Sequence, residues 1–261
     1  MKNALAVYVR EVRSYFVSPI FYILAFVFMV VIGNVFKDSF FSFATETMRS
    51  LRYAQNYKAP IPLLSVTMVA RQVFSYINFL FLLIVPLLTM RLYAEEKKNG
   101  TMELLMTSPI TTVQVLMGKF FSALTIYTLM LALTITFDVI MMVESGGKLD
   151  WGTVWSSYLG SILLGGAIIS IGMFFSSLTE NQIVAAATTI ATIMGFWLLI
   201  QTSRFLDPPL SDIVRFLSFS DHLDYFTMGF ISVKHIVYFL SVTMFGLFLT
   251  GITVESARWR Q

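Results

Sequence analysis

Long apolar runs separated by short polar segments dominate the chain. Six runs are long enough, or nearly so, to cross about 30 Å of hydrocarbon at about 1.5 Å per helical residue. They cover residues 19–36, 73–90, 113–143, 154–175, 183–200 and 236–254. The pattern predicts an all-α polytopic membrane protein with six transmembrane helices, organised as a single transmembrane domain over residues 1–261.

The first 18 residues follow a different pattern. Lys2, Arg10 and Arg13 lie on one helical face, while Leu5 and Val12 lie near the opposite one. This periodicity predicts an amphipathic helix over residues 1–18 that lies in the membrane interface. A cleaved signal peptide is the alternative. The apolar run that follows is longer than a signal-peptide core and has no clear small-residue cleavage site after it, so we expect an uncleaved first span.

Two polar segments are expected on the far side of the membrane from residue 1. In residues 37–72 we expect one short surface helix near 40–53, before Pro60 and Pro62 force an extended exit. Residues 204–234 interleave charged and aromatic side chains, which favours a short helix or a re-entrant hairpin at the interface. The role of residues 37–72, functional loop or simple tether, stays open.

The longest charged segment covers residues 91–119, between the second and third apolar runs. Two acids and two bases precede the pair Asn99-Gly100, which is typical of a helix that ends with a left-handed residue. These four residues are Glu95, Glu96, Lys97 and Lys98. A helix that follows the second span is therefore expected to stop at Gly100.

A second short helix is expected directly after this stop. Thr101 is its expected N-cap, and Glu103 places a negative charge in the first turn, where the helix dipole favours it. Pro109 ends the helix. Its apolar face consists of Leu104, Leu105 and Met106. The sequence thus predicts a short amphipathic element held at the membrane surface by the spans on both sides.

Composition supports the membrane interpretation and excludes other classes. The chain is 57% hydrophobic and 13% charged, against about 25% charged residues in soluble proteins. It has no cysteine, which excludes a disulfide framework and any cysteine-ligated metal. A net charge of +3 is too small to indicate nucleic acid, whereas basic side chains beside spans commonly contact lipid headgroups.

The chain lacks the motifs of common enzymes. Gly118-Lys119 and Gly147-Lys148 are not followed by Ser or Thr, so neither pair belongs to a P-loop that could hold ATP. No HExxH, GxSxG or paired-carboxylate cluster occurs. The acids and histidines that could suggest a metal site are Asp221, His222, Asp224 and His235. They contain no close histidine pair in sequence, so we expect no bound metal, no cofactor and no catalytic residue.

One acidic residue lies inside an apolar run. Asp138 follows Lys119 by about 28 Å of helix, which places it near the outer interface. An intramembrane acid is a functional candidate by default. Two interpretations stay open for Asp138: a headgroup or helix-packing role, and a substrate or proton role.

Small residues recur at intervals of four in two of the spans. Ser157, Ser161 and Gly165 predict a close helix contact within the fourth span. A second stripe in the fifth span consists of Ala187, Ala191 and Gly195. This stripe is either a seam within the chain or a seam between two copies.

Three segments together carry a family resemblance. EEKKNGTMELLMTSP, NQIVAA at residues 181–186 and ESARWR at residues 255–260 resemble the membrane subunits of type-2 ABC transporters, and in particular the permease subfamily of gliding-motility systems. The resemblance covers nearly the whole chain. It implies that residues 94–109 form a coupling helix that docks into an ATPase. The implied contacts are Glu95, Glu96, Gly100, Thr101, Glu103, Leu104, Leu105 and Pro109. It also implies that the second small-residue stripe borders the dimer axis and the translocation path.

The resemblance further implies the partners and the location. They are two copies of a cytoplasmic ATPase subunit that binds ATP and Mg, a second permease copy or a homologous permease, membrane lipids and an extracytoplasmic auxiliary subunit; no nucleic acid is expected. A bacterial inner membrane with both termini cytoplasmic is implied, while basic residues are equally numerous on both sides and favour this orientation only through their density.

The implied function is to couple ATP hydrolysis by a separate subunit to export or to force transmission across the membrane. Two alternatives remain at this point. One is a secondary transporter driven by an ion gradient, and the other is a non-transporting mechanical or scaffolding component of a gliding-type machine. No charge ring, aromatic cage or acidic path in the sequence identifies a substrate.

Overall fold

The computed structural model describes residues 2–57, 65–102 and 110–258 of the chain. These residues are almost all helical, and no strand occurs among them. The helices are α1 (Lys2–Val17), α2 (Pro19–Tyr57), α3 (Thr67–Thr89), α4 (Arg91–Lys98), α6 (Thr112–Leu133), α7 (Ile135–Glu144), α8 (Trp151–Leu178), α9 (Gln182–Ser203), α10 (Leu210–Leu217), α11 (Phe219–Thr227) and α12 (Val233–Arg258).

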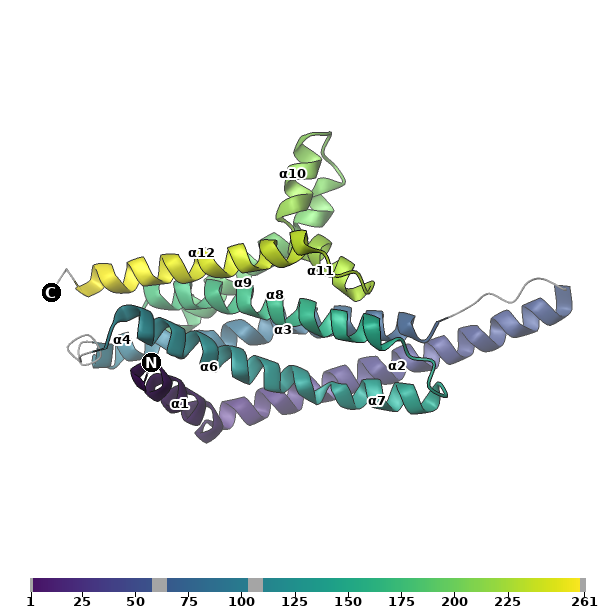
Figure 1. The fold of residues 1–261 in the computed structure, drawn as a ribbon, viewed down its shortest axis with the longest axis horizontal. Helices are drawn as coiled ribbons and strands as arrows, with labels where there is room; N and C mark the ends of the chain where they lie inside the picture. The colour runs from purple at the N-terminus through teal and green to yellow at the C-terminus, as the bar shows by residue number, and fades with distance from the viewer. Residues whose placement is uncertain (1, 58–64, 103–109, 259–261) are drawn as a thin grey trace.

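Six helical segments of the described chain are long and apolar enough to span a membrane, which confirms the all-α polytopic prediction. They are Pro19–Asn56, Thr67–Lys98, Thr112–Glu144, Trp151–Leu178, Gln182–Ser203 and Val233–Ser256. Long helices lie lengthwise in one bundle, and α4 and both chain ends lie at the same end of it (Figure 1). We call this the α4 end of the bundle.

Helix α2 is longer than the sequence indicated. It continues for 39 residues, about 58 Å at 1.5 Å per residue, which is about twice the hydrocarbon thickness. The expected separate surface helix near residues 40–53 was therefore wrong, because that segment is the second half of α2. No glycine or proline lies between Gly33 and Pro60, so nothing in the sequence forces the helix to stop at the membrane surface.

The third apolar run, expected as one helix, is interrupted at Thr134. The Thr134 hydroxyl donates to the Leu131 carbonyl at 2.7 Å, a local bond that competes with regular helix geometry. Helix α6 ends just before this residue and α7 begins just after it. The span is therefore interrupted in its C-terminal half.

Helix α8 lies at the centre of the bundle and packs against α3, α6, α11 and α12. Its glycines allow close approach: an added Cβ would overlap the Tyr127 ring at Gly165, the Thr89 side chain at Gly172 and the Phe226 ring at Gly160. The packing role predicted for the small residues of this span is confirmed, since helices in lipid associate through such close contacts.

The segment between α9 and α12 contains two short helices. All of α10 is exposed or half-buried, and it stands away from the rest of the bundle (Figure 1). Helix α11 is held to α12 by two buried histidines, whose Nδ1 atoms are 2.6 Å apart. His222 Nε2 donates to the Phe216 carbonyl at 2.8 Å, and burial lowers the pKa of His222. The described residues contain no group of three or more His, Cys, Asp or Glu that could hold a metal ion.

Candidate functional site

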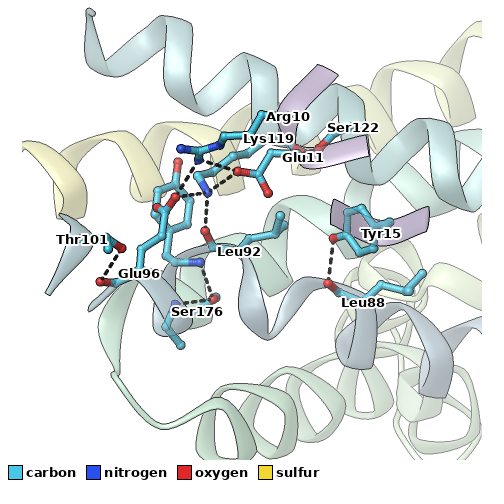
Figure 2. Close-up of polar contacts among 12 residues, drawn as sticks. Arg10, Glu11, Tyr15, Leu88, Leu92, Glu96, Thr101, Lys119, Ser122 and Ser176 are labelled. Atoms are coloured by element: carbon cyan, nitrogen blue, oxygen red, sulfur yellow. Dashed lines mark hydrogen bonds and ion pairs between the residues drawn. The ribbon is translucent and has the colours of Figure 1, made fainter. Parts of the chain in front are cut away.

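Four charged side chains meet where α1, α4 and α6 converge at the α4 end of the bundle (Figure 2). Lys119 of α6 is only 1% exposed. Its Nζ donates to Glu11 Oε1 of α1 at 3.1 Å, to Glu96 Oε1 of α4 at 2.9 Å and to the Leu92 carbonyl at 2.6 Å. One buried cation therefore joins three helices.

A second cation completes this group from the solvent side. The Arg10 guanidinium donates to Glu11 Oε1 at 2.7 Å and to Glu96 Oε1 at 2.8 Å. Each of these two carboxylate oxygens thus binds both a buried lysine and a half-exposed arginine. We call Arg10, Glu11, Glu96 and Lys119 the charge cluster.

The local sequence explains why the cluster forms. Thr111 and Gln114 make a capping box that starts α6. At Gly118 the missing side chain lets α1 approach, since an added Cβ would lie 2.9 Å from Val7. The next residue, Lys119, then points at Glu11 across a close helix contact.

Burial and charge act in opposite directions on Glu11. Burial alone would raise the pKa of its carboxyl, but Lys119 and Arg10 outweigh that effect and hold the pKa of Glu11 below its usual value. Glu11 is therefore ionised at neutral pH. Because the Lys119 ammonium is withdrawn from water, it depends on these acids, as a buried charge is costly without partners.

Helix α4 is also fixed to the end of α8. Ser176 Oγ accepts from the backbone N–H groups of Tyr93 and Ala94, both at 3.1 Å (Figure 2), and it donates to the Met90 carbonyl at 2.9 Å. Lys97 Nζ donates to the Ser177 carbonyl. The start of α4 is thus capped by a side chain from another span, and its end is bonded to the last turn of α8.

Glu95 and Glu96, both expected to contact an ATPase, have different surroundings in the structure. Glu96 turns into the charge cluster, with its side chain 14% exposed. Glu95 is half-buried at the cluster's edge, and its side chain makes no hydrogen bond or ion pair with the described residues. Of the two acids, Glu95 is the one left free to bind a partner.

The expected stop after α4 is confirmed. Gly100 has a φ of +69°, and no atom lies within 4 Å of the position a Cβ would take. The exposed tip of α4 consists of Lys98, Asn99, Gly100 and Thr101. The Thr101 hydroxyl donates to the Glu96 carbonyl at 3.2 Å, so it is engaged with the preceding helix. Glu103, Leu104, Leu105 and Pro109 lie outside the described residues.

Two hollows are lined in part by residues of the tip. One, of about 280 Å³, is lined by the charge cluster together with Ser14, Arg91, Leu92, Glu95, Asn99 and Thr101. The other, of about 510 Å³, is lined by Lys98, Glu180, Asn181, Gln182 and Ile183. The turn between α8 and α9 therefore belongs to the same surface as the α4 tip.

The second small-residue stripe lies on the surface of the chain. Ala187, Ala191 and Gly195 are all exposed on α9, and an added Cβ at Gly195 would meet no atom within 4 Å. The stripe thus makes no close helix contact with the part of the chain that the structure describes.

The sequence analysis predicted neither the charge cluster nor the contacts between α4 and α8. The available signal was Lys119, a lysine at the head of an apolar run, which requires a carboxylate partner if it is to be buried. Glu11 is 108 residues away, and nothing local identifies it as that partner.

Comparison with known proteins identifies a family for this chain. A search of curated proteins found no significant match. The family model described as "ABC-2 family transporter protein" matches residues 5–257. In such systems the membrane component is not itself catalytic, and an ABC ATPase is a separate subunit. Since the match covers nearly all of the chain, this protein belongs to the ABC-2 family of transporter membrane proteins.

Proposed function

We propose that this chain is a permease subunit that couples ATP hydrolysis by a separate ABC ATPase to export or to force transmission, with residues 94–109 as the coupling segment. The observation that carries this proposal is the buried Lys119, which joins α4 to α1 and α6. Together with the Ser176 contacts to α8, it bonds α4, the helix that carries the tip, to three other helices. A displacement of the tip would therefore reach the spans.

The surface around the tip supports docking of an ATPase. The tip is exposed and polar, and the hollows beside it could receive side chains of a partner. Both chain ends lie at the same end of the bundle (Figure 1), which fits cytoplasmic termini in an inner membrane. The partners we propose are two ATPase copies that carry ATP and Mg, and a second permease copy that contacts the exposed stripe on α9. The subfamily of gliding-motility permeases remains part of this proposal.

Family membership favours ATP as the energy source over an ion gradient. Within this family, export and force transmission differ in whether a solute crosses the membrane. The apolar and small side chains on α9 do not identify a solute.

Changing Glu95 to lysine tests the docking surface directly. If Glu95 meets a basic group of the ATPase, reversing its charge should cost about 2–5 kcal/mol, which lowers ATPase affinity roughly 30-fold or more. The measurement is binding of the ABC ATPase subunit to the full chain in nanodiscs, with ATP hydrolysis by the complex as a second readout. Thermal unfolding should be unchanged, since Glu95 has no described side-chain partner.

Glu144→Lys is the matched control for this charge reversal, because Glu144 is exposed at the opposite end of its span. It should bind the ATPase like the wild type. Equal affinity for the Glu95→Lys and Glu144→Lys chains would remove the α4 tip from the interface.

The stripe on α9 gives a test of dimerisation. Ala191→Leu combined with Gly195→Leu adds bulk where we propose close contact with a second copy, and should weaken the dimer by about 1–3 kcal/mol. Gly251→Leu on α12 is a control, since an added Cβ there also meets no atom within 4 Å. The dimer fraction is measured by mass photometry in detergent. A dimer fraction that falls equally in both variants, or in neither, would contradict an intersubunit seam on α9.

A further inference from the structure

A chain of four oxygen atoms links α6, α7 and α8 at the joint in the third span. Asp138 of α7 is buried, and its Oδ2 lies 2.7 Å from the Tyr158 hydroxyl oxygen of α8. The Tyr158 oxygen lies 3.0 Å from Thr134 Oγ1. Thr134 Oγ1 lies 2.7 Å from the Leu131 carbonyl oxygen. All three distances are in the range of O–H···O hydrogen bonds.

Counting hydrogens along this chain distinguishes the two states of Asp138. A tyrosine and a threonine hydroxyl bring one hydrogen each, whereas a carboxylate and a carbonyl only accept. With an ionised Asp138, two hydrogens must serve three contacts. One contact, for instance that between Thr134 and Tyr158, would then bring two lone pairs together without a hydrogen. With a protonated Asp138, each contact has one hydrogen.

The protonated state also gives every bond a direction. Asp138 donates to Tyr158, Tyr158 donates to Thr134, and Thr134 donates to the Leu131 carbonyl, which ends the chain as an acceptor. Hydrogen bonds aligned in this way polarise and strengthen one another. The relay needs no atom beyond those four side-chain and main-chain groups.

The surroundings offer no cation to balance a negative charge. Among the described ion pairs none includes Asp138, in contrast to Glu11 and Glu96, which each contact both Lys119 and Arg10. Tyr158 packs edge-on against Phe74 of α3, and Phe137 packs against Phe36 of α2. The charged groups on these helices are Lys37, Asp38, Glu46, Arg49 and Arg52 of α2, Arg71 of α3, Lys119 of α6 and Glu144 of α7, and α8 adds the titratable Tyr158. Of these, only Tyr158 makes a described hydrogen bond with Asp138.

We propose that Asp138 is a proton-binding site, and that its carboxyl carries a proton in this arrangement of the helices. Deprotonation breaks the O–H bond of Asp138, passes the proton to water and leaves a carboxylate. Thr134 is both a member of the relay and the residue at which α6 gives way to α7. A movement of α7 at this joint would separate the Asp138 carboxyl from Tyr158 and admit water to that carboxyl. The site thus couples one bound proton to the position of α7.

Infrared spectroscopy of the full chain in lipid nanodiscs tests the site. A protonated carboxyl has a carbonyl stretch that is distinct from those of carboxylates and amides, and that shifts on exchange into D₂O. At neutral pH we expect this band in the wild type and in the Asp38→Asn control, whose carboxyl is exposed. It should be lost in Asp138→Asn. A band that is missing from the wild type, or that persists in Asp138→Asn, would overturn the proposal.

A second variant tests the proposal if the Asp138→Asn chain does not insert into the membrane. Thr134→Val removes the acceptor of Tyr158 but leaves Asp138 and Tyr158 in place. The relay is then shortened, so the hydrogen bond donated by Asp138 weakens and the carbonyl band should shift while staying present. An unshifted band in Thr134→Val would show that the proton is not held by this relay.

Discussion

Replacing Lys119 with methionine is expected to destabilise the chain by about 3–5 kcal/mol, the cost of breaking a buried ion pair by removing one partner. Methionine is close to lysine in length and fills the same space. The loss is therefore electrostatic: Glu11 and Glu96 keep only the half-exposed Arg10 as a counter-ion. The Leu92 carbonyl also loses its donor. Unfolding by a denaturing detergent, followed in a lipid-containing micelle, measures the change.

Two further variants separate the charge effect from other causes. Lys148→Met removes an exposed lysine and should leave stability unchanged. Combining Lys119→Met with Glu11→Gln and Glu96→Gln removes the unpaired charges and should recover most of the loss, since neutral groups are less costly to bury. If the triple variant is no more stable than Lys119→Met alone, packing rather than charge is the main role of Lys119.

Acidification should reduce the destabilisation that Lys119→Met causes. The pKa of Glu11 is held below its ordinary value by Lys119 and Arg10, against the effect of burial. A carboxyl with a lowered folded pKa contributes stability that is present above its ordinary pKa and is lost as the pH falls through the lowered value. The difference in stability between wild type and Lys119→Met should therefore narrow as the solution is acidified below the ordinary pKa of glutamate.

Placing a methyl group at Gly165 should have the second largest effect. The added Cβ overlaps the ring of Tyr127 on α6. The hydroxyl of Tyr127 is fixed by a 2.6 Å hydrogen bond to the Ser161 carbonyl of α8, the helix that also contains Gly165. The ring cannot move away without losing that bond, so α6 and α8 must separate. Gly165→Ala should cost about 1–3 kcal/mol, as overpacking does. The readout is the same detergent unfolding curve.

Gly195→Ala is the matched control, because it makes the same change in a neighbouring span with no atom within 4 Å. Glycine inside a helix is less favourable than alanine by about 0.5–1 kcal/mol, so this variant should be neutral or slightly stabilising. Equal stability of the two alanine variants would mean that the contact between α6 and α8 is looser than the structure has it.

Glu95 and Glu96 are not equivalent positions for testing ATPase docking, because only Glu96 belongs to the charge cluster. A substitution at Glu96 would disturb the charge cluster and with it the contact between α1, α4 and α6. Loss of ATPase binding in a Glu96 variant would therefore not separate docking from folding. Glu95 does separate them, because its side chain has no described partner within the chain.

The sequence alone determined the helical type and the number of the segments that can span a membrane. In lipid, backbone polar groups must be satisfied within each helix, so a long apolar run predicts a spanning helix from local information. The stop at Gly100 was equally local, since the left-handed conformation depends on the residue itself. The small-residue spacing in α8 predicted close helix contacts because interval and residue size are both visible in the sequence.

Tertiary structure decided which side chains meet. Lys119 and Glu11 are 108 residues apart, and Asp138 and Tyr158 lie on different spans, so their pairing depends on how each helix is rotated and packed. The same holds for Glu95 and Glu96, which are adjacent in sequence yet about 100° apart around the helix axis. Hydrophobic periodicity shows which residues enter the membrane. The partner of each buried polar group is set by helix packing, because only packing brings distant donors and acceptors within bonding distance.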